Sequence, residues 1–298
     1  MPASSLPTSR VGVPARTQGT VLEFLCQRFA HIPATVWQQR LHDGLVCDDH
    51  GHPLQASDSV AGIQHIRYQR AVAHEPAIPF EASILFQNEH LLVADKPHFL
   101  PVMPAGQYVQ QTLLHRLQQH TGLPQLSPLH RIDRDTAGLV LFSTNPASRN
   151  AYHALFRQRQ VRKIYQAIAP FDPHFLQPRE HHSHLAEDPQ DFFRMAEHPG
   201  PSNSHTRLHI TETIGRWARY QLEPITGKRH QLRVHMATLG IPIRHDPYYP
   251  HLNEPAVGDY SHPMQLLAQE LHFTDPLTGH STRFVSQQTL CVPEGLEK

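Results

Sequence analysis

Lysine and cysteine are scarce in this chain of 298 residues, and long apolar runs are missing. No stretch approaches the roughly 18 apolar residues of a transmembrane helix, and the first residues lack the apolar core of a secretory signal. The hydrophobic share of 39% is nevertheless that of a folded chain. The three cysteines, Cys26, Cys47 and Cys291, form neither a CxxC pair nor a disulfide framework. We therefore expect a cytoplasmic protein without a membrane partner.

A net charge is also missing, since 26 basic residues balance 26 acidic ones. The balance hides an unusual choice of cation, because only four of the basic residues are lysines and 22 are arginines, which bind phosphate through a planar fork. Residues 143–165 carry five cations and no acid, and residues 216–233 carry five cations and one acid. A solvated helix face would explain either stretch alone, but together they favour a polyanionic partner.

Composition divides the chain into four parts. Residues 1–19 are rich in proline, serine and threonine and are expected to form a mobile leader. Residues 20–70 contain two stretches whose apolar residues have helical spacing, followed by strand-like segments. This pattern is typical of a small helix–helix–hairpin domain. Residues 71–82 contain two prolines and are expected to form a linker. Residues 83–298 form the remaining, larger domain.

The larger domain mixes strands and helices without a strict βαβ rhythm, which indicates an α+β fold. Hydrophobic periodicity predicts its elements at residues 84–94 (a hairpin), 112–120 (helix), 138–142 (strand), 146–158 (helix), 161–169 (strand), 220–222 (strand), 228–239 (helix) and 266–273 (strand). Residues 171–204 are rich in proline, histidine and acidic residues, so we expect them to form a loop or an irregular insert.

A charged loop before the predicted strand 138–142 is the first candidate site. It holds two carboxylates, Asp133 and Asp135, and two guanidiniums, Arg131 and Arg134. A carboxylate paired with arginine stays ionised, and an ionised carboxylate can act as a nucleophile or a base. The alternative is a salt-bridged turn that only precedes a buried strand.

A basic motif at residues 226–235 is the second candidate. It opens with threonine and glycine, which suit a helix start, where free N–H groups beside Lys228 and Arg229 would bind an anion. Arg229 and Arg233 lie four residues apart, so a helix would place them on one face. The alternative is an amphipathic basic helix without a site.

Histidine is abundant, with 26 residues, and three of them lie together within residues 181–184. Metal binding needs convergent ligands, yet the sequence contains no HExxH motif and no zinc-finger pairing of cysteine with histidine. Since histidines are spread over the whole chain, local clusters are expected by chance. We therefore expect no dedicated metal site, and a histidine-dependent metalloprotein remains only as an alternative.

Five segments in the same order resemble the RluA-type RNA pseudouridine synthases. The loop HRIDRDTAGLVLFS, residues 130–143, is similar to the family's HRLDxxTSGL signature. The other four segments are ILFQNEHLLVADKPHFLPVMP (84–104), RKIYQAI (162–168), ITGKRHQLRVHMATLGIPIRHDPYY (225–249) and LLAQELHFTDPLTG (266–279). Any one match alone would be weak evidence for the family, but five collinear matches over about residues 80–285 are strong evidence.

The resemblance implies a mixed, largely antiparallel sheet with flanking helices and a central active-site cleft. It implies that Asp133 is the catalytic aspartate, that Tyr165 lies beside the uracil, and that Arg233 is the basic partner of the aspartate. Arg131 would fill the RNA stack where the target uridine has left. Residues 20–70 weakly resemble a small RNA-binding module, and RNA contact by this part is left open.

The predicted activity is the isomerisation of specific uridines in ribosomal or transfer RNA to pseudouridine. No redox step or group transfer occurs, so neither a cofactor nor a metal is expected. The loop and the two basic stretches are predicted to contact RNA through Arg131 and also through Arg134, Arg149, Arg157, Arg159, Arg162, Lys228, Arg229 and His230. The protein is expected to act as a monomer. The alternative within this fold is an RNA-binding protein without turnover.

Overall fold

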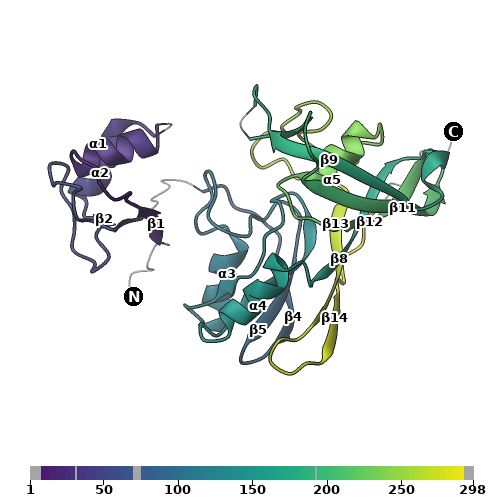
Figure 1. Cartoon of the computed structure of the whole chain (residues 1–298), viewed down its shortest axis with the longest axis horizontal. Helices are drawn as coiled ribbons and strands as arrows, with labels where there is room; N and C mark the ends of the chain where they lie inside the picture. Colours follow the sequence, from purple (N-terminus) through teal and green to yellow (C-terminus); the bar gives the residue numbers. More distant parts are fainter. Residues whose placement is uncertain (1–7, 31, 70–74, 192, 292–298) are drawn as a thin grey trace. The chain divides into compact units, whose positions relative to one another are not determined.

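The structure, a computed structural model, describes residues 8–291 apart from residues 31, 70–74 and 192 (Figure 1). The described chain divides into two compact units. The small unit comprises the residues up to 75 together with 104–110, and the large unit comprises residues 76–103 and those from 111 onward. No helix within the described ranges is long and apolar enough to span a lipid bilayer.

In the small unit, two helices and three strands share one apolar core. The elements are β1 (Thr8–Gly12), α1 (Val21–Arg28), α2 (Ala34–His42), β2 (Val46–Cys47) and β3 (His65–Gln69), and the strand order is β1-β3-β2. Helix α1 starts with a capping box. The Thr20 hydroxyl accepts from the Glu23 N–H, and the Glu23 carboxylate accepts from the Thr20 N–H. The two predicted helices of this part are confirmed.

The expected mobile leader is wrong from Thr8 onward, because β1 pairs antiparallel with β3 along its whole length. Val11 is buried in the core of the small unit and anchors this edge strand. A short edge strand with few core residues shows little hydrophobic periodicity, so composition did not indicate it. Residues 1–7, and residues 71–74 of the expected linker, lie outside the described part of the chain.

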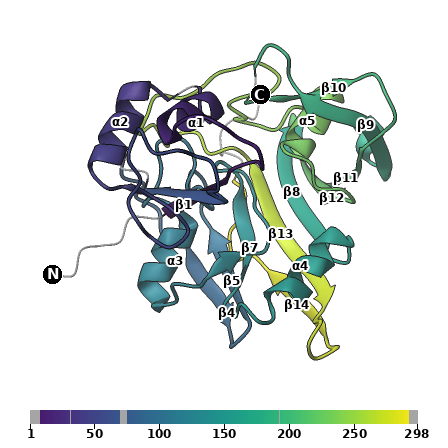
Figure 2. The same cartoon turned by 60° about the vertical axis from the view of Figure 1, so that its left-hand side comes forward.

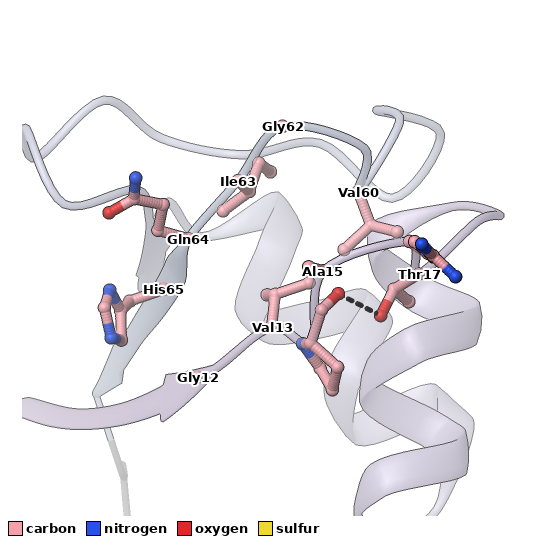
Figure 3. A pocket seen from close by; sticks show the side chains of 11 residues that line it. Gly12, Val13, Ala15, Thr17, Val60, Gly62, Ile63, Gln64 and His65 are labelled. Carbon is pink, nitrogen blue, oxygen red and sulfur yellow. Dashed lines mark hydrogen bonds between the residues drawn. The ribbon is translucent and has the colours of Figure 1, made fainter.

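A pocket of about 570 Å³ opens on the small unit (Figure 3). Its walls are the turn after β1, within residues 12–17, and the segment before β3, within residues 60–65. The Thr17 hydroxyl donates a hydrogen bond of 2.7 Å to the Pro14 carbonyl and so fixes the turn. None of the lining residues belongs to the two candidate motifs, which lie in the large unit.

The large unit is built on one mixed sheet, whose main path runs β10-β9-β11-β12-β8-β13-β7-β5-β4, with β14 paired to β13 and β6 to β7. The strands are β4 (Ser83–Gln87), β5 (Leu91–Lys96), β6 (Ser127–Pro128), β7 (Ala137–Ser143), β8 (Arg162–Pro170), β9 (Arg179–Glu187), β10 (Met195–His198), β11 (Ser204–Ile214), β12 (Trp217–Pro224), β13 (Leu266–Thr274) and β14 (Ser281–Val285). Among these described strands, only β7 and β13 pair in parallel, which confirms the predicted mixed, largely antiparallel sheet.

Helices α4 and α5 pack on different parts of this sheet (Figure 2). The helices of the large unit are α3 (Leu113–Thr121), α4 (Arg149–Arg157) and α5 (Gln231–Thr238), with a short 3-10 helix at Pro173–Phe175. Tyr152 and Leu155 of α4 pack with residues of β5, β7 and β13. Leu232 and Met236 of α5 pack instead with residues of β8, β11 and β12. Together with the strands, these helices confirm the predicted α+β class.

Where β13 runs between β7 and β8, the strand register brings distant segments of the sequence together. Ala268 of β13 pairs in parallel with Gly138 of β7 and antiparallel with Tyr165 of β8. Gly138 has a φ of +109°, and a Cβ at this position would collide with the Ala268 carbonyl. Only glycine permits this close approach of β7 to β13. The charged loop ahead of β7 is thereby set beside β13, whose other neighbour is β8, the strand that carries Tyr165.

Replacing Gly138 with alanine should therefore destabilise the large unit strongly. The added methyl group would press on the backbone of Ala268, which cannot move without disturbing two strand pairings. We expect the free energy of unfolding in urea to fall by about 3 kcal/mol or more. The control is Gly122→Ala, at a φ of +68° with open space around the new Cβ, which should cost about 1 kcal/mol. Equal losses in the two variants would contradict the steric role of Gly138.

Strands β9 and β10 lie within residues 171–204, so the expected loop or irregular insert is wrong. Strand β9 pairs with β11, and β10 pairs with β9, at one end of the sheet. Leu185 and Met195 are the buried side chains of β9 and β10, and they pack with Val234 of α5. Backbone pairing thus supports strands whose polar, histidine-rich side chains show no clear two-residue alternation.

Helix α5 begins at Gln231, three residues later than predicted, and Thr226 does not cap it. The Gln231 side chain explains the difference. Its carbonyl oxygen accepts hydrogen bonds from the Thr226 hydroxyl at 2.7 Å and from the Lys228 N–H at 3.1 Å, which holds the preceding residues as a loop. Lys228 and Arg229 therefore precede the helix, and the prediction that Arg229 and Arg233 share a helix face is wrong.

The end of β5 is tied to the segment after β14 through a buried carboxylate. Asp95 accepts hydrogen bonds from the Ser286 hydroxyl at 2.8 and 2.9 Å, from the Gln287 N–H at 2.7 Å and from the Gln288 amide at 2.8 Å. The Gln288 amide also donates to the Lys96 carbonyl at 2.7 Å. These hydrogen bonds among Asp95, Lys96 and residues 286–288, called the Asp95 clasp below, help to fix the strand end that carries Lys96.

Candidate active site

Asp133 lies in the loop between β6 and β7, and its carboxylate meets a buried arginine of α5. Asp133 Oδ2 accepts a hydrogen bond of 3.1 Å from Arg233 Nη1. The Arg233 side chain is 2% exposed and that of Asp133 is 28% exposed, so the pair joins an interior cation to a partly buried carboxylate. The fold thus brings together two residues that lie 100 positions apart in the sequence.

A second carboxylate holds Arg233 in place. Asp246 accepts hydrogen bonds from Arg233 Nε and Nη2, both at 2.7 Å, and from the N–H groups of Tyr248 and Tyr249. The guanidinium carbon lies 4.9 Å and 5.3 Å from the centroids of these two tyrosine rings. Burial alone would lower the pKa of Arg233, but the hydrogen bonds and charge of Asp246 raise it. Arg233 is therefore a permanent cation whose Nη1 is directed at Asp133.

His230 lies on another side of the Asp133 carboxylate. Its Nε2 is 4.0 Å from Asp133 Oδ1, and its Nδ1 is 2.9 Å from the Tyr249 hydroxyl. That hydroxyl accepts a hydrogen bond from the Met195 N–H, so its own hydrogen is available to Nδ1. This network assigns the imidazole proton to Nε2, facing Asp133. Burial lowers the pKa of His230 to about 4, so the ring is neutral at pH 7.

The surroundings of Asp133 favour its ionised form. Burial opposes ionisation, yet the charges of His230 and Arg233 and the hydrogen bond from Arg233 outweigh burial and lower the pKa of Asp133. Because His230 is neutral near pH 7, Arg233 is the cation that acts on Asp133 by direct contact under those conditions. A carboxylate in this state can attack carbon or accept a proton throughout the neutral range.

Lys96, the last residue of β5, is a buried lysine that the sequence analysis missed. Its Nζ donates hydrogen bonds to the carbonyls of Pro97 and Arg134, both at 2.9 Å. Burial lowers the pKa of Lys96 to about 7, against the opposing charges of Asp135 and Asp133. By holding the Arg134 carbonyl, Lys96 fixes the backbone next to Asp133. A lysine that ends the apolar strand LLVADK is the signal that could have indicated it.

Tyr165 is half-buried on β8, where its strand neighbours are Leu222 of β12 and Ala268 of β13. Burial and the charge of Asp133 raise the pKa of its phenol. The hydroxyl therefore stays protonated at neutral pH, which suits a side chain that stacks and donates a hydrogen bond rather than one that accepts a proton.

The predicted RNA contacts differ in exposure. The exposed ones are Arg131, Arg157, Arg159, Arg162, Lys228 and Arg229. Arg134 and Arg149 are half-buried, and each is already bonded. Arg134 donates to the Asp135 carboxylate at 3.0 Å, and Arg149 donates to the Gln125 carbonyl at 2.6 Å. The side chain of His230 is only 9% exposed, so this residue belongs to the surroundings of Asp133 rather than to the surface.

Arg162 lies on the opposite face of β8 from Tyr165, because the side chains of a strand alternate between its faces. Its guanidinium donates two hydrogen bonds, at 2.8 and 3.0 Å, to the Glu223 carboxylate. Lys163 lies on the same face as Tyr165, although it was not predicted as a contact. Its Nζ would be 3.5 Å from a Cβ at Gly227, which places it beside the loop before α5.

Known proteins share this combination of sequence and fold. The family model described as RNA pseudouridylate synthase matches residues 90–238. An uncharacterised RNA pseudouridine synthase of Synechocystis is 31% identical over 239 residues, which cover 77% of this chain and 79% of that protein. The dual-specificity RNA pseudouridine synthase RluA of Haemophilus influenzae is 29% identical over 227 residues, which cover 72% of this chain and 96% of that protein.

A solved human structure, RNA Pseudouridylate Synthase Domain Containing 1, has the same fold. It aligns with a TM-score of 0.59 at 21% identity and covers 72% of this chain and 86% of its own. The alternatives of an idle RNA-binding protein and of a histidine-dependent metalloprotein are not favoured by these matches. The chain belongs to the RNA pseudouridine synthases of the RluA type and is thus an isomerase that converts uridine in RNA to pseudouridine.

Proposed function

We propose that Asp133 acts at the sugar of the target uridine, either as a nucleophile that attacks C1′ or as a base. In this isomerisation the C1′–N1 bond breaks, the uracil turns, and C5 bonds to C1′, while C5 loses a proton and N1 gains one. The observation that carries the proposal is the hydrogen bond of 3.1 Å to the buried Arg233, which keeps the carboxylate ionised and oriented. The test is whether Asp133→Asn still releases tritium from RNA labelled at uridine C5.

The other residues of the site would support this step. Tyr165 would stack on the detached uracil and donate a hydrogen bond, since its phenol stays protonated. Arg131, which is exposed at the loop, would fill the gap left by the flipped uridine. Lys96 and Asp246 would be positioning residues, because they act through the Asp133 loop and through Arg233.

We propose that Lys163 and its cationic neighbours bind the RNA backbone. Lys163 has no carboxylate partner in the described ranges of the chain, and burial together with the charge of Arg159 lowers its pKa. Lys228 directly follows Gly227, which lies beside the Lys163 side chain. A phosphate group among these cations would relieve their repulsion. The proposed set of RNA contacts therefore includes Lys163 in place of Arg162. The other exposed arginines stay in the set, namely Arg131, Arg157, Arg159 and Arg229.

RNA affinity should consequently fall steeply as salt concentration rises. Each phosphate contact adds about 0.7 to the slope of log affinity against log salt for single strands and about 0.9 for duplexes. Lys163→Gln and Arg159→Gln should each reduce the slope by about that amount, measured by fluorescence anisotropy with labelled transfer RNA. Arg162→Gln is the matched control, since its charge is already paired with Glu223 on the other face. A flat salt dependence, or equal slopes in all three variants, would contradict the proposal.

The proposed substrate is ribosomal or transfer RNA, modified by a monomer in the cytoplasm. The relative from Haemophilus influenzae is named a dual-specificity enzyme, which supports keeping more than one kind of RNA target open. The three cysteines are free, as expected in a reducing compartment. Mapping of pseudouridines in total RNA from cells with and without this protein identifies the target. Sites lost only from messenger RNA would contradict the proposed substrate.

A further inference from the structure

Strands β9 and β11 lie side by side (Figure 1), and a cluster on them brings two histidines and a carboxylate together. Glu180 and His182 lie two positions apart on β9 and so share one face of the strand. His205 and Arg207 occupy the matching positions of β11, because His182 pairs with His205 and Glu180 pairs with Arg207. Strand register therefore gathers four polar side chains that come from two separate segments of the sequence.

The potential ligand atoms of this cluster converge. His182 Nε2 lies 3.3 Å from Glu180 Oε2, and His205 Nε2 lies 3.1 Å from the same oxygen. The two imidazole rings stack with their centroids 3.8 Å apart and an angle of 19° between their planes. In a tetrahedral zinc site with bonds of about 2.0–2.1 Å, neighbouring ligand atoms lie about 3.3 Å apart. The separations to the carboxylate oxygen already match this spacing.

Arg207 turns the carboxylate towards the two histidines. Its Nε donates a hydrogen bond of 2.8 Å to Glu180 Oε1, which leaves Oε2 directed at both imidazoles. Hydrogen bonds of this kind, to the free oxygen of a ligating carboxylate, orient ligands in metal sites.

A second group, formed by His181, Glu197 and His235, is not an equivalent candidate. His235 is 1% exposed, and both of its ring nitrogens already bond to hydroxyl groups at 2.9 to 3.1 Å. A metal there would have to displace these buried hydrogen bonds. Glu180 and His182, by contrast, have side chains that are about half exposed, so an ion can reach them from solvent.

We propose that Glu180, His182 and His205 bind a divalent transition-metal ion, for which zinc is the best fit. Two imidazole nitrogens and one carboxylate oxygen suit zinc, and the exposed side of the cluster leaves the remaining position to water. The bound ion would join β9 to β11. The sequence analysis expected no metal site, because spacing along the chain cannot show ligands that meet across two strands.

The test uses the full chain after dialysis against a strong chelator. Co²⁺ is added first, because cobalt held by nitrogen and oxygen ligands in low coordination absorbs visible light far more strongly than aqueous cobalt. We expect one strongly absorbing Co²⁺ to bind per chain and Zn²⁺ to displace it. The melting temperature of the protein should be higher with bound Zn²⁺ than without metal. Glu180→Gln and His205→Gln should each weaken binding at least about tenfold, since even changes outside the ligand set typically cost that much.

Two further variants separate this cluster from other histidines. His209→Gln removes a histidine from the same face of β11, opposite Gln221, and should leave cobalt binding unchanged. His181→Gln affects only the second group and should also leave it unchanged. Unaltered affinity and spectrum in Glu180→Gln and His205→Gln would overturn the proposal. The three ligands lie outside the contacts of Asp133, so chelation should leave pseudouridine formation intact, and the two proposals can fail independently.

Discussion

Asp133→Asn is expected to abolish pseudouridine formation, with a loss in rate of at least about a thousandfold. The amide has nearly the shape of the carboxylate and can still accept a hydrogen bond from Arg233, so the fold and the affinity for RNA should remain close to those of the parent. It carries no negative charge, however, and can neither attack C1′ nor accept a proton. Tritium release from uridine labelled at C5 measures the rate, and anisotropy measures RNA binding separately.

The neighbouring carboxylate provides the comparison. Asp135 is buried, and it accepts a hydrogen bond from Arg134 rather than from Arg233. Asp135→Asn should therefore reduce the rate much less than Asp133→Asn, although it alters the charge that acts on Lys96. If the two variants retained equal activity, the assignment of Asp133 would be wrong.

Arg233→Met should lower activity and move the acidic limb of the pH–rate profile to higher pH. In the parent, the hydrogen bond and charge of Arg233 help to lower the pKa of Asp133 against the effect of burial. Without this cation, burial raises the pKa, so less of the carboxylate is ionised at any given acidic pH. Arg233→Lys should give an intermediate shift, because a point charge replaces part of the field but not the planar fork.

The effect on the pH–rate profile has to be separated from an effect on stability, because Arg233→Met also leaves a second carboxylate, Asp246, without its cationic partner. Asp246 would lose both hydrogen bonds from the guanidinium while it stays buried, at a cost of about 3–5 kcal/mol. The double variant Arg233→Met/Asp246→Asn removes that buried charge, and the asparagine oxygen can still accept from the Tyr248 N–H. Its stability should recover, whereas the shifted pH profile should remain.

Single-turnover rates against pH at saturating RNA distinguish the outcomes. Arg229→Met is the control, since this arginine is exposed, precedes α5 and donates to the Arg194 carbonyl. It should weaken RNA binding and leave the profile in place. An unshifted profile in the double variant would mean that Arg233 serves only to hold Asp246 and that another group keeps Asp133 ionised.

The candidate site residues Asp133, Tyr165 and Arg233 could be predicted from the sequence, because each lies in a short segment that resembles a family motif and the segments follow in the family's order. The structure brings Asp133 within 3.1 Å of Arg233 and sets both near the strand of Tyr165. Lys96 and Asp246 were missed, although they lie inside matching segments. Their importance depends on burial and on partners across the fold, and neither can be seen in local residue spacing.

The errors in the fold have a common physical cause. Strands β1, β9 and β10 each bury a single apolar side chain and pair with a neighbouring strand, and the loop before α5 is held by the polar side chain of Gln231. Hydrophobic periodicity detects elements that bury a regular apolar face, such as β7 or α3. It does not detect elements that attach to an existing sheet through hydrogen bonds.

We expect the Asp95 clasp to delay completion of the active site during synthesis of the chain. Asp95 leaves the ribosome 191 residues ahead of Ser286, the first of the three residues that satisfy its carboxylate. Until those residues emerge, the Asp95 carboxylate cannot be buried without a cost, and the Lys96 carbonyl lacks the hydrogen bond from the Gln288 amide. The backbone beside Asp133 in turn depends on Lys96. We therefore expect a growing chain to expose the cations proposed to bind RNA before the surroundings of Asp133 are complete.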